Sequence, residues 1–275
     1  MIAFLAAGGL TGCGNDRSFS TPDISNGRVA QNGEFSAVVL LSYETEQGRA
    51  VCSGTFISPT TVLTAAHCTM GGQITNGLTG EVDLQISLIR PERNADGSLA
   101  PHILANSTAV FRHPDWDTAF EQRQVNKFDT ALVEFPAGFA RDTATISRRE
   151  GQPGDPVTIV GYGLDYVPGL LGRSNPDASS LGVKRIGTNT LMDTGGLSVY
   201  DGMHFFQGEI DTGDASGENG NAAPGDSGGA MFNQAGELIG VTSGGGKLLT
   251  TAASIYINLH SDHSRGFLRQ RGLTY

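Results

Sequence analysis

The sequence has 275 residues, 39 of them glycine, and a formal net charge of −10 at pH 7. This length allows one large β domain or two small ones. Charged residues make up 17% and hydrophobic residues 38% of the chain, which suits a globular all-β protein and argues against a disordered one. The acidic balance argues against a nucleic-acid partner.

The first thirteen residues form an apolar segment that ends at Cys13 and is too short to span a membrane. Its last four residues, Leu10–Cys13, read Leu-Thr-Gly-Cys and resemble the lipobox of bacterial lipoprotein signals. That resemblance implies a lipid on Cys13, which would anchor the protein to a membrane. A plain secretory signal is the alternative. Either interpretation predicts an exported protein, in the bacterial cell envelope or secreted, with residues 14–23 as a tether or propeptide.

A histidine follows the second of two strands predicted over residues 51–68, which are joined by a turn at residues 58–60. The second strand runs into the segment Leu-Thr-Ala-Ala-His-Cys, so His67 lies just beyond its end. A base at this place needs a nucleophile and an orienting acid from elsewhere in the chain. We interpret the other histidines as surface or core residues: His102, His113, His204, His260 and His263.

The candidate acid lies further along the chain, after a strand predicted over Val82–Arg90. Asp129 lies two residues before the apolar segment 131–135, whereas the rival acids Asp115 and Asp117 lie in a polar loop. The carboxylate that orients a catalytic histidine must be held rigidly. The mouth of a strand holds it better than a loop, so we predict Asp129.

The second half of the chain begins with a connection at residues 147–154. Strands are predicted at residues 157–163 and 203–210, with a surface insertion at 164–180. Asp211, Asp214 and Glu218 then lie in a loop of small residues. Their oxygens could bind calcium, but the spacing is not that of an EF-hand, and a solvated acidic loop is the preferred interpretation.

The candidate nucleophile is Ser227, in the segment Gly-Asp-Ser-Gly-Gly at residues 225–229. These residues also satisfy G-x-S-x-G, the nucleophile elbow of α/β-hydrolases, which place their acid and histidine after the serine. Here His67 and Asp129 precede it, and residues 230–241 read as a hairpin instead of a helix. The order of the motifs therefore disfavours an α/β-hydrolase esterase.

The three segments around His67, Asp129 and Ser227 together resemble the trypsin/chymotrypsin-like serine endopeptidases. The resemblance covers about residues 24–272. It implies an all-β fold of two six-stranded antiparallel Greek-key β-barrels packed together, with the active site in the cleft between them. The barrels are expected at about residues 35–146 and 155–258, and a short C-terminal helix is expected to pack on the second barrel.

The resemblance also implies the chemistry. Ser227 would attack a peptide bond, His67 would act as base and then acid, and Asp129 would orient His67. The backbone N–H groups of Gly225 and Ser227 would form the oxyanion hole. We therefore expect an acyl-enzyme mechanism on protein or peptide substrates, with no cofactor, no metal ion and a monomeric chain.

Two further features follow from the resemblance. A disulfide between Cys52 and Cys68 is implied, which would close the loop under the histidine and indicates an oxidising compartment. Cleavage before Ile24 would free an α-amino group that pairs with Asp226, so the protein is expected to be made as a zymogen. In that case activation would also separate the enzyme from a lipid on Cys13.

The specificity pocket is implied at five positions: Asn221, Ala222, Ser243, Gly244 and Gly245. Asn221 falls at the pocket floor, where its neutral amide disfavours strict Lys/Arg specificity. Gly244 and Gly245 would leave an open wall with room for a large neutral side chain. A catalytically silent binding lipoprotein on the same fold is the alternative function.

Overall fold

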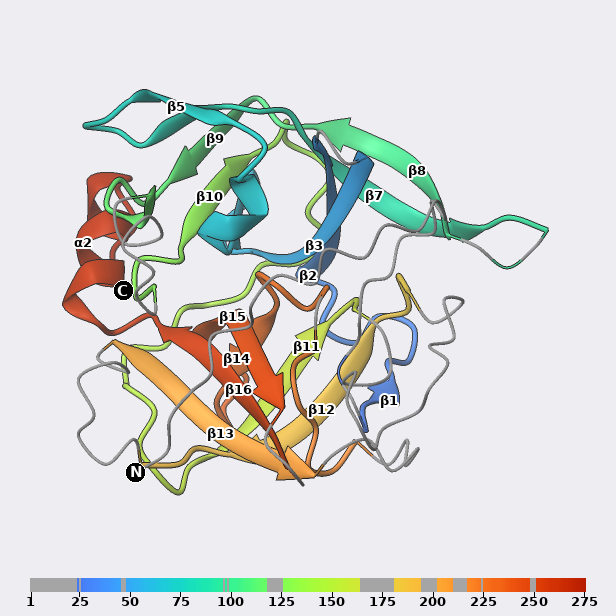
Figure 1. Ribbon diagram of the computed structural model, residues 1–275, viewed down its shortest axis with the longest axis vertical. Coiled ribbons are helices and arrows are strands. Elements are labelled where there is room, and N and C mark those ends of the chain that lie inside the picture. Colours follow the sequence, from blue (N-terminus) through green and yellow to red (C-terminus); the bar gives the residue numbers. More distant parts are fainter. Residues whose placement is uncertain are drawn as a thin grey trace.

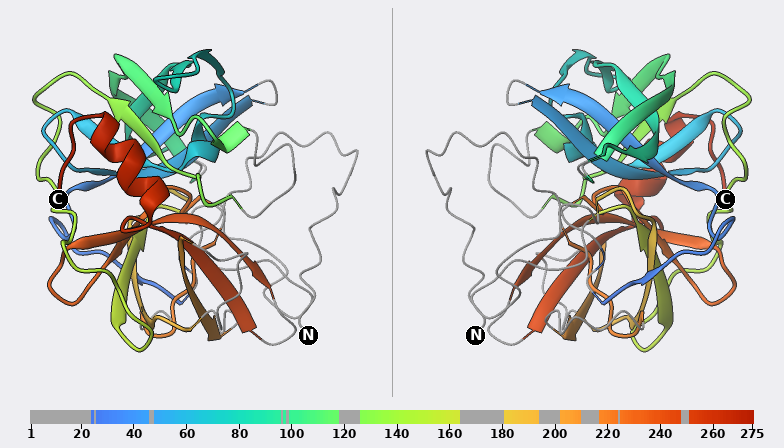
Figure 2. Two further views of the ribbon diagram at one scale, coloured as in Figure 1. Left: turned by 90° about the vertical axis from the view of Figure 1, so that its left-hand side faces the viewer. Right: turned by 90° about the vertical axis from the view of Figure 1, so that its right-hand side faces the viewer.

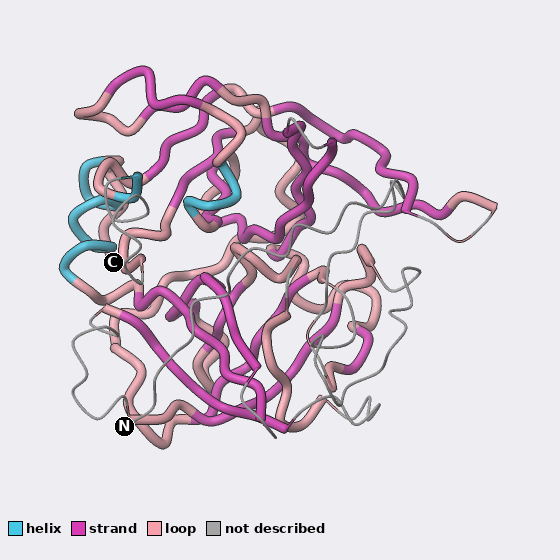
Figure 3. The backbone as a smooth tube through the Cα atoms, viewed as in Figure 1, coloured by secondary structure: helices cyan, strands magenta, loops and turns pink. Residues whose placement is uncertain are grey.

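Two curled antiparallel β-sheets form the body of the protein, one above the other in Figure 1. The computed structural model describes residues 24, 26–45, 48–95, 97, 99–117, 126–163, 181–193, 202–209, 217–223, 225–247 and 251–275. Strands and loops dominate this part of the chain, with very little helix (Figure 3). The predicted all-β fold class is confirmed.

The upper sheet has nine strands in the order β5-β6-β9-β10-β4-β3-β2-β7-β8. Its strands are β2 (Val38–Thr45), β3 (Gly48–Phe56), β4 (Thr61–Thr64), β5 (Gln73–Asn76), β6 (Glu81–Asp83), β7 (Ile86–Arg93), β8 (Leu99–Asn106), β9 (Ala109–Arg112) and β10 (Ala131–Glu134). The sheet has more than the expected six strands because short strands extend one edge and the long β7–β8 hairpin extends the other.

The lower sheet has seven strands in the order β1-β12-β11-β14-β15-β16-β13. Its strands are β1 (Arg28–Val29), β11 (Pro156–Gly161), β12 (Arg185–Thr190), β13 (Met203–Glu209), β14 (Ala230–Phe232), β15 (Leu238–Lys247) and β16 (Thr251–Asn258). The hairpin predicted after Ser227 is confirmed as β14 and β15. β1 precedes the upper sheet in sequence but pairs with β12, so the first strand belongs to the lower sheet.

The single strand predicted over Val82–Arg90 is wrong, because two strands occupy this segment. β6 ends at Asp83 and pairs with β5 and β9, whereas β7 begins at Ile86 and pairs with β2 and β8. The N–H of Leu84 donates to the carbonyl of Val82, which turns the chain out of β6. The alternating pattern continues across the break, so periodicity alone could not show that the chain changes partners.

The predicted C-terminal helix is present as α2 (Asp262–Gln270). Ser261 caps it by accepting a hydrogen bond from the N–H of Ser264. In the left view of Figure 2, α2 runs beside the upper sheet down to the boundary between the sheets. The rings of Phe267 and His113 lie 5.3 Å apart, so the helix contacts the upper sheet instead of packing only on the lower one.

The largest hydrophobic core joins the two sheets. It contains Leu41 and Leu63 of the upper sheet, Phe232 and Val241 of the lower sheet, and Phe267 of the helix. A second cluster lies within the lower sheet and includes Ile24. Because apolar side chains from both sheets share one core, the loops that join them are held in a fixed relation at the boundary.

Candidate active site

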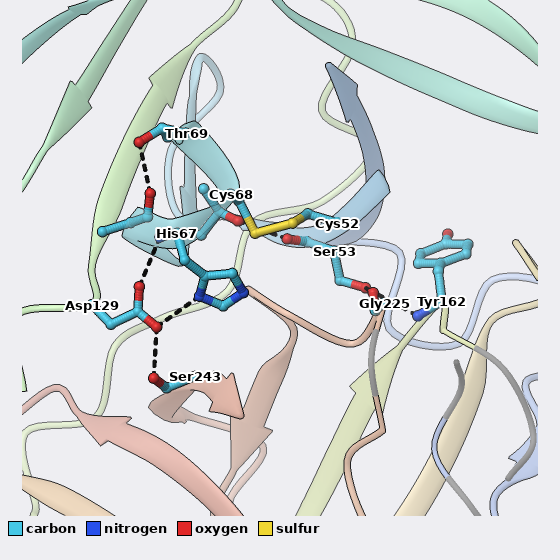
Figure 4. The surroundings of a disulfide bond; sticks show 11 residues. Cys52, Ser53, His67, Cys68, Thr69, Asp129, Tyr162, Gly225 and Ser243 are labelled. Carbon is cyan, nitrogen blue, oxygen red and sulfur yellow. Dashed lines mark hydrogen bonds and ion pairs between the residues drawn. A yellow bond between two sulfur atoms is a disulfide. The ribbon is translucent and has the colours of Figure 1, made fainter. Parts of the chain in front are cut away.

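His67 lies in a short 3₁₀ turn, η1 (Ala66–Thr69), directly after β4. Ala65 has an extended backbone, and its carbonyl accepts a hydrogen bond from the N–H of Cys68. Cys68 is bonded to Cys52 of β3, which confirms the predicted disulfide (Figure 4). The backbone on both sides of His67 is therefore buried and crosslinked, whereas its side chain is 24% exposed.

Asp129 lies two residues before β10 and is buried. β10 runs antiparallel to β4 with Ala131 opposite Thr64, so the residues that precede β10 lie beside those that follow β4. The N–H of His67 donates to Asp129 Oδ1 at 2.8 Å, and Oδ2 lies 2.8 Å from His67 Nδ1 (Figure 4). Strand pairing thus brings together two of the three predicted catalytic residues.

The two rival acids have other partners. Asp115 has an exposed side chain whose carboxylate lies 3.9 Å from Nδ1 of His113. Asp117 forms an ion pair with Arg112 at 2.7 Å. Of the three candidate acids, Asp129 is therefore the one that contacts His67.

The carboxylate of Asp129 also sets the electrostatics of His67. Burial by itself would lower the pKa of His67, but the charge of Asp129 and its hydrogen bond outweigh burial and raise the pKa above its ordinary value. The bond to Nδ1 also favours the tautomer whose Nε2 is free to accept a proton. The pair therefore has the arrangement of a general base and its orienting acid.

Ser243 of β15 adds a second hydrogen bond to the same carboxylate oxygen. Its Oγ donates to Asp129 Oδ2 at 2.6 Å (Figure 4). From the sequence, Ser243 is predicted only as a residue of the specificity pocket, since no local pattern links it to Asp129. Through this bond, the lower sheet fixes an acid that belongs to the upper sheet.

Ser227 lies in a glycine-rich turn that is clamped onto the upper sheet. The N–H of Ser53 donates to the carbonyl of Ser227 at 2.8 Å. Ser53 Oγ donates to the carbonyl of Gly225 at 3.2 Å, and both residues are drawn in Figure 4. Gly228 has a φ of +78°, and a Cβ added to it would lie 2.0 Å from Oγ1 of Thr64. This close approach places the nucleophile segment against the strand that leads to His67.

Ser53 is a functional residue that sequence reasoning missed. Besides its bonds to the nucleophile segment, its Oγ accepts a hydrogen bond from the N–H of Tyr162 at 3.0 Å. It thus joins β3 to two segments of the lower sheet. The only signal in the sequence is its position directly after Cys52.

The predicted oxyanion hole comprises the N–H groups of Gly225 and Ser227. Within the described ranges, neither N–H has a hydrogen-bond acceptor. Gly225 has a φ of +96°, a backbone conformation that glycine adopts at little cost. Both N–H groups are therefore available to bind an oxyanion, as the prediction requires.

Asp226 is fully buried beneath this turn. Its two oxygens accept hydrogen bonds from the N–H groups of Gly163 and Ala223, each at 3.1 Å. Burial raises the pKa of Asp226 well above its ordinary value, against the opposing effects of these bonds and of the nearby charge of Arg185. Gly161 is required here, because a Cβ on it would lie 2.0 Å from Oδ1 of Asp226.

Ile24, the predicted activation residue, is 1% exposed and lies in the core of the lower sheet. Its side chain packs against Gly187 of β12 and against Gly220, where an added Cβ would collide with or crowd it. Its carbonyl accepts a hydrogen bond from the N–H of Gly27. The residue thus occupies a defined apolar site in the sheet that also holds Asp226.

The predicted pocket residues lie on neighbouring segments of the lower sheet. Asn221 is fully buried, and its Oδ1 accepts a hydrogen bond from Oγ of Ser254 at 3.4 Å; the same hydroxyl accepts from the N–H of Ala222. An added Cβ at Gly244 would have no atom within 4 Å, which agrees with an open wall. At Gly245 it would lie 2.6 Å from the carbonyl oxygen of Ala253, so this glycine permits a close approach and does not itself open space.

Several predictions lie outside the described residues: the lipobox with Cys13, the tether, the insertion at 164–180, and Asp211 and Asp214 of the acidic loop. No helix in the described ranges is long and apolar enough to cross a membrane. In the same ranges, one group of metal-ligating side chains converges, formed by Cys52, His67 and Cys68. Because its two sulfurs are bonded to each other, it lacks the thiolates that a metal would need.

Comparisons with known proteins agree with this geometry. A family model described as Trypsin matches residues 24–262. No curated protein matches the chain. Among solved structures, one described as HL collagenase is similar, with a TM-score of 0.63 and 18% sequence identity over 92% of this chain and 100% of that chain. At this identity, the structural likeness shows the fold alone.

Proposed function

The chain belongs to the trypsin family, and we propose that it is a serine endopeptidase that acts through His67, Asp129 and Ser227. The observation that carries the proposal is the carboxylate of Asp129, which contacts both the backbone N–H and Nδ1 of His67. The glycine-rich turn of Ser227 packs on the strand that leads to that histidine.

The proposed reaction begins when Ser227 Oγ attacks the carbonyl carbon of a peptide bond and gives its proton to Nε2 of His67. The N–H groups of Gly225 and Ser227 stabilise the oxyanion of the tetrahedral intermediate, and one such donor is worth about 3 kcal/mol. His67 then protonates the leaving amine, which leaves an ester on Ser227. Water, activated by the same histidine, hydrolyses this ester.

We further propose that the protein is made as a zymogen and activated by cleavage before Ile24. The new α-amino group would pair with Asp226, whose buried carboxyl needs a cation to become ionised at neutral pH. The charge of Arg185 already acts on Asp226. If the charge of Arg185 is enough to ionise Asp226, the site is active before cleavage. Labelling before and after cleavage distinguishes this case from activation by the new α-amino group.

The substrates are expected to be proteins or peptides, without strict preference for Lys or Arg. Asn221, the residue proposed at the pocket floor, is buried, and its neutral amide accepts a hydrogen bond from the hydroxyl of Ser254, so neither group supplies a charge to a basic side chain. A neutral residue is the preferred partner of this surface. We propose that the enzyme is a monomer, is exported, and is lipid-anchored through Cys13 until cleavage before Ile24 releases it.

Labelling with a fluorophosphonate tests the nucleophile and the activation together. Purified full-length protein is treated before and after limited proteolysis near Ile24, and the labelled peptide is mapped, with Ser227→Ala as the control. Labelling of Ser227 only after cleavage supports both the endopeptidase and the zymogen. Labelling of Ser227 without cleavage supports the endopeptidase but contradicts activation through an ion pair between the freed α-amino group of Ile24 and Asp226.

The alternative is a catalytically silent binding lipoprotein on the same fold. An absence of labelling in both states would favour it over the enzyme. The α/β-hydrolase esterase finds no support, because a strand, β14, follows Ser227 in an all-β fold. N-terminal mass analysis of labelled material separately tests the release step, since a labelled species that still begins at Cys13 would contradict it.

A further inference from the structure

We propose that Arg112 is a positioning residue that fixes the contact between His67 and Asp129; the proposal rests on the function proposed for this site. Arg112 ends β9 and is 3% exposed, although its guanidinium is permanently charged. Burial of such a group is costly unless its donors are satisfied. The partners of those donors therefore indicate what the residue holds in place.

Three of its hydrogen bonds go to the turn that carries His67 and to the residues just after it. Nε donates to Oγ1 of Thr69 at 2.7 Å, and Nη2 donates to the carbonyls of Thr69 and Gly72. The Thr69 hydroxyl in turn donates to the carbonyl of Ala66 at 2.7 Å. Ala66 and Thr69 are the first and last residues of η1, so Arg112 holds both ends of the turn around His67.

On its other side, the guanidinium faces the segment that follows β9. Nη1 forms an ion pair with Asp117 at 2.7 Å, and the central carbon lies 5.1 Å from the ring centre of Trp116. Trp116 is buried in a small cluster with Ala66 and Ala131. Since Ala131 lies opposite Arg112 in the β9–β10 register, the cluster packs the histidine turn onto the strand that follows the acid.

The same cluster reaches Asp129 through one asparagine. The side-chain amide of Asn126 donates to the carbonyl of Trp116 at 2.9 Å, and the N–H of Asp129 donates to the carbonyl of Asn126 at 3.1 Å. The loop that presents the acid is thus tied to the residue on which Arg112 stacks. One buried side chain therefore joins the supports of both members of the pair.

The effect of Arg112 on His67 is geometric. The charge that raises the pKa of His67 is that of Asp129, and the neighbouring Cys52–Cys68 sulfurs form a disulfide and do not titrate. Loosening the turn would weaken the Asp129 contact and let burial lower the pKa. A lysine could not replace the guanidinium, because one ammonium cannot reach the Thr69 hydroxyl and the carbonyls of Thr69 and Gly72 in the fixed fork that arginine supplies.

The test compares wild-type and Arg112→Met proteins. Each is used in the form, cleaved or uncleaved near Ile24, in which Ser227 of the wild type reacts with the fluorophosphonate. Two quantities are measured: the rate of fluorophosphonate labelling as a function of pH, and the pKa of His67 by NMR titration of its ring protons. We expect the labelling rate to fall about 100-fold, the loss that a displacement of about 1 Å causes in a catalytic geometry. We also expect the acid limb of the rate and the NMR pKa of His67 to move together to lower pH.

Three variants separate positioning from general stability. Thr69→Val removes the hydroxyl that accepts from Arg112 and donates to the carbonyl of Ala66. In the double variant, its effect on the labelling rate should not add to that of Arg112→Met. Asp117→Asn removes the ion pair but keeps the bonds to the turn, so it should label nearly as the wild type does. Arg93→Met is the control for loss of an arginine that bonds two backbone carbonyls away from the site, because Arg93 is an exposed residue of β7, near the opposite edge of the same sheet.

A folded Arg112→Met protein with an unchanged labelling rate and an unchanged His67 pKa would overturn the proposal. An Asp117→Asn effect as large as that of Arg112→Met would also overturn it, because the ion pair would then be the essential contact. If Arg112→Met does not fold, Thr69→Val decides the matter by the same two measurements. The NMR titration needs no activity, so it separates failure of this proposal from failure of the proposed function.

Discussion

Breaking the disulfide between Cys52 and Cys68 should lower the free energy of unfolding by about 3 kcal/mol. The two cysteines are separated by 16 positions. The loop-closure expression gives an entropy change of about −10 cal/mol/K for a loop of this size, which is about 3 kcal/mol at 25 °C. This is a large share of the roughly 5–15 kcal/mol that stabilises a typical protein.

The assay is equilibrium unfolding in urea of wild-type, Cys52→Ala and Cys52→Ala/Cys68→Ala proteins. With an m-value of about 3 kcal/mol/M, the midpoint should fall by about 1 M. Both variants break the crosslink, but the single variant keeps the Cys68 sulfur in the core. Similar losses in the two variants would assign the effect to the crosslink. A loss below about 1 kcal/mol in both would refute the loop-closure reasoning.

Three further changes have expected outcomes. Asp129→Asn replaces the carboxylate that accepts from Nδ1 of His67 with a neutral amide, so labelling of Ser227 should slow by about 10⁴-fold. The acid limb of the plot of labelling rate against pH should move to lower pH, because the raised pKa of His67 depends on that carboxylate. Gly228→Ala should destabilise the protein strongly, since the residue has a φ of +78° and no space for a Cβ, whereas Gly244→Ala, with no atom within 4 Å, should leave the unfolding midpoint unchanged. Burial lowers the pKa of His204 to about 4, so this side chain stays neutral in the folded state while the unfolded state takes up a proton below about pH 6.5. As the pH is lowered between these two values, the free energy of unfolding should therefore fall by up to about 1.4 kcal/mol per pH unit. Unfolding of His204→Gln at several pH values should show a smaller dependence of this free energy on pH.

Three short motifs are enough to predict the triad candidates, and the family resemblance that they carry predicts the fold class. His67, Asp129 and Ser227 each lie in a short segment that is informative without a structure, and their order in the chain separates the two motifs that contain such a serine. The hairpin after Ser227 was also predicted, because alternating apolar residues around a glycine turn are a local signal. Local patterns do not show where one strand ends and the next begins with different pairing partners. β6 and β7 are such a case, since the alternation of apolar and polar residues continues from one strand to the other.

The contacts that hold these candidates in place are visible only in the folded protein. His67 and Asp129 are 62 residues apart, and Ser243 bonds Asp129 across 114 residues. The antiparallel pairing of β4 with β10 and the packing of the two sheets create these contacts, and neither leaves a mark on the local sequence. The same holds for Ser53 and Arg112, whose roles depend on hydrogen bonds to distant backbone carbonyls. Every residue offers such a carbonyl, so the side chain alone cannot reveal which one it will bind.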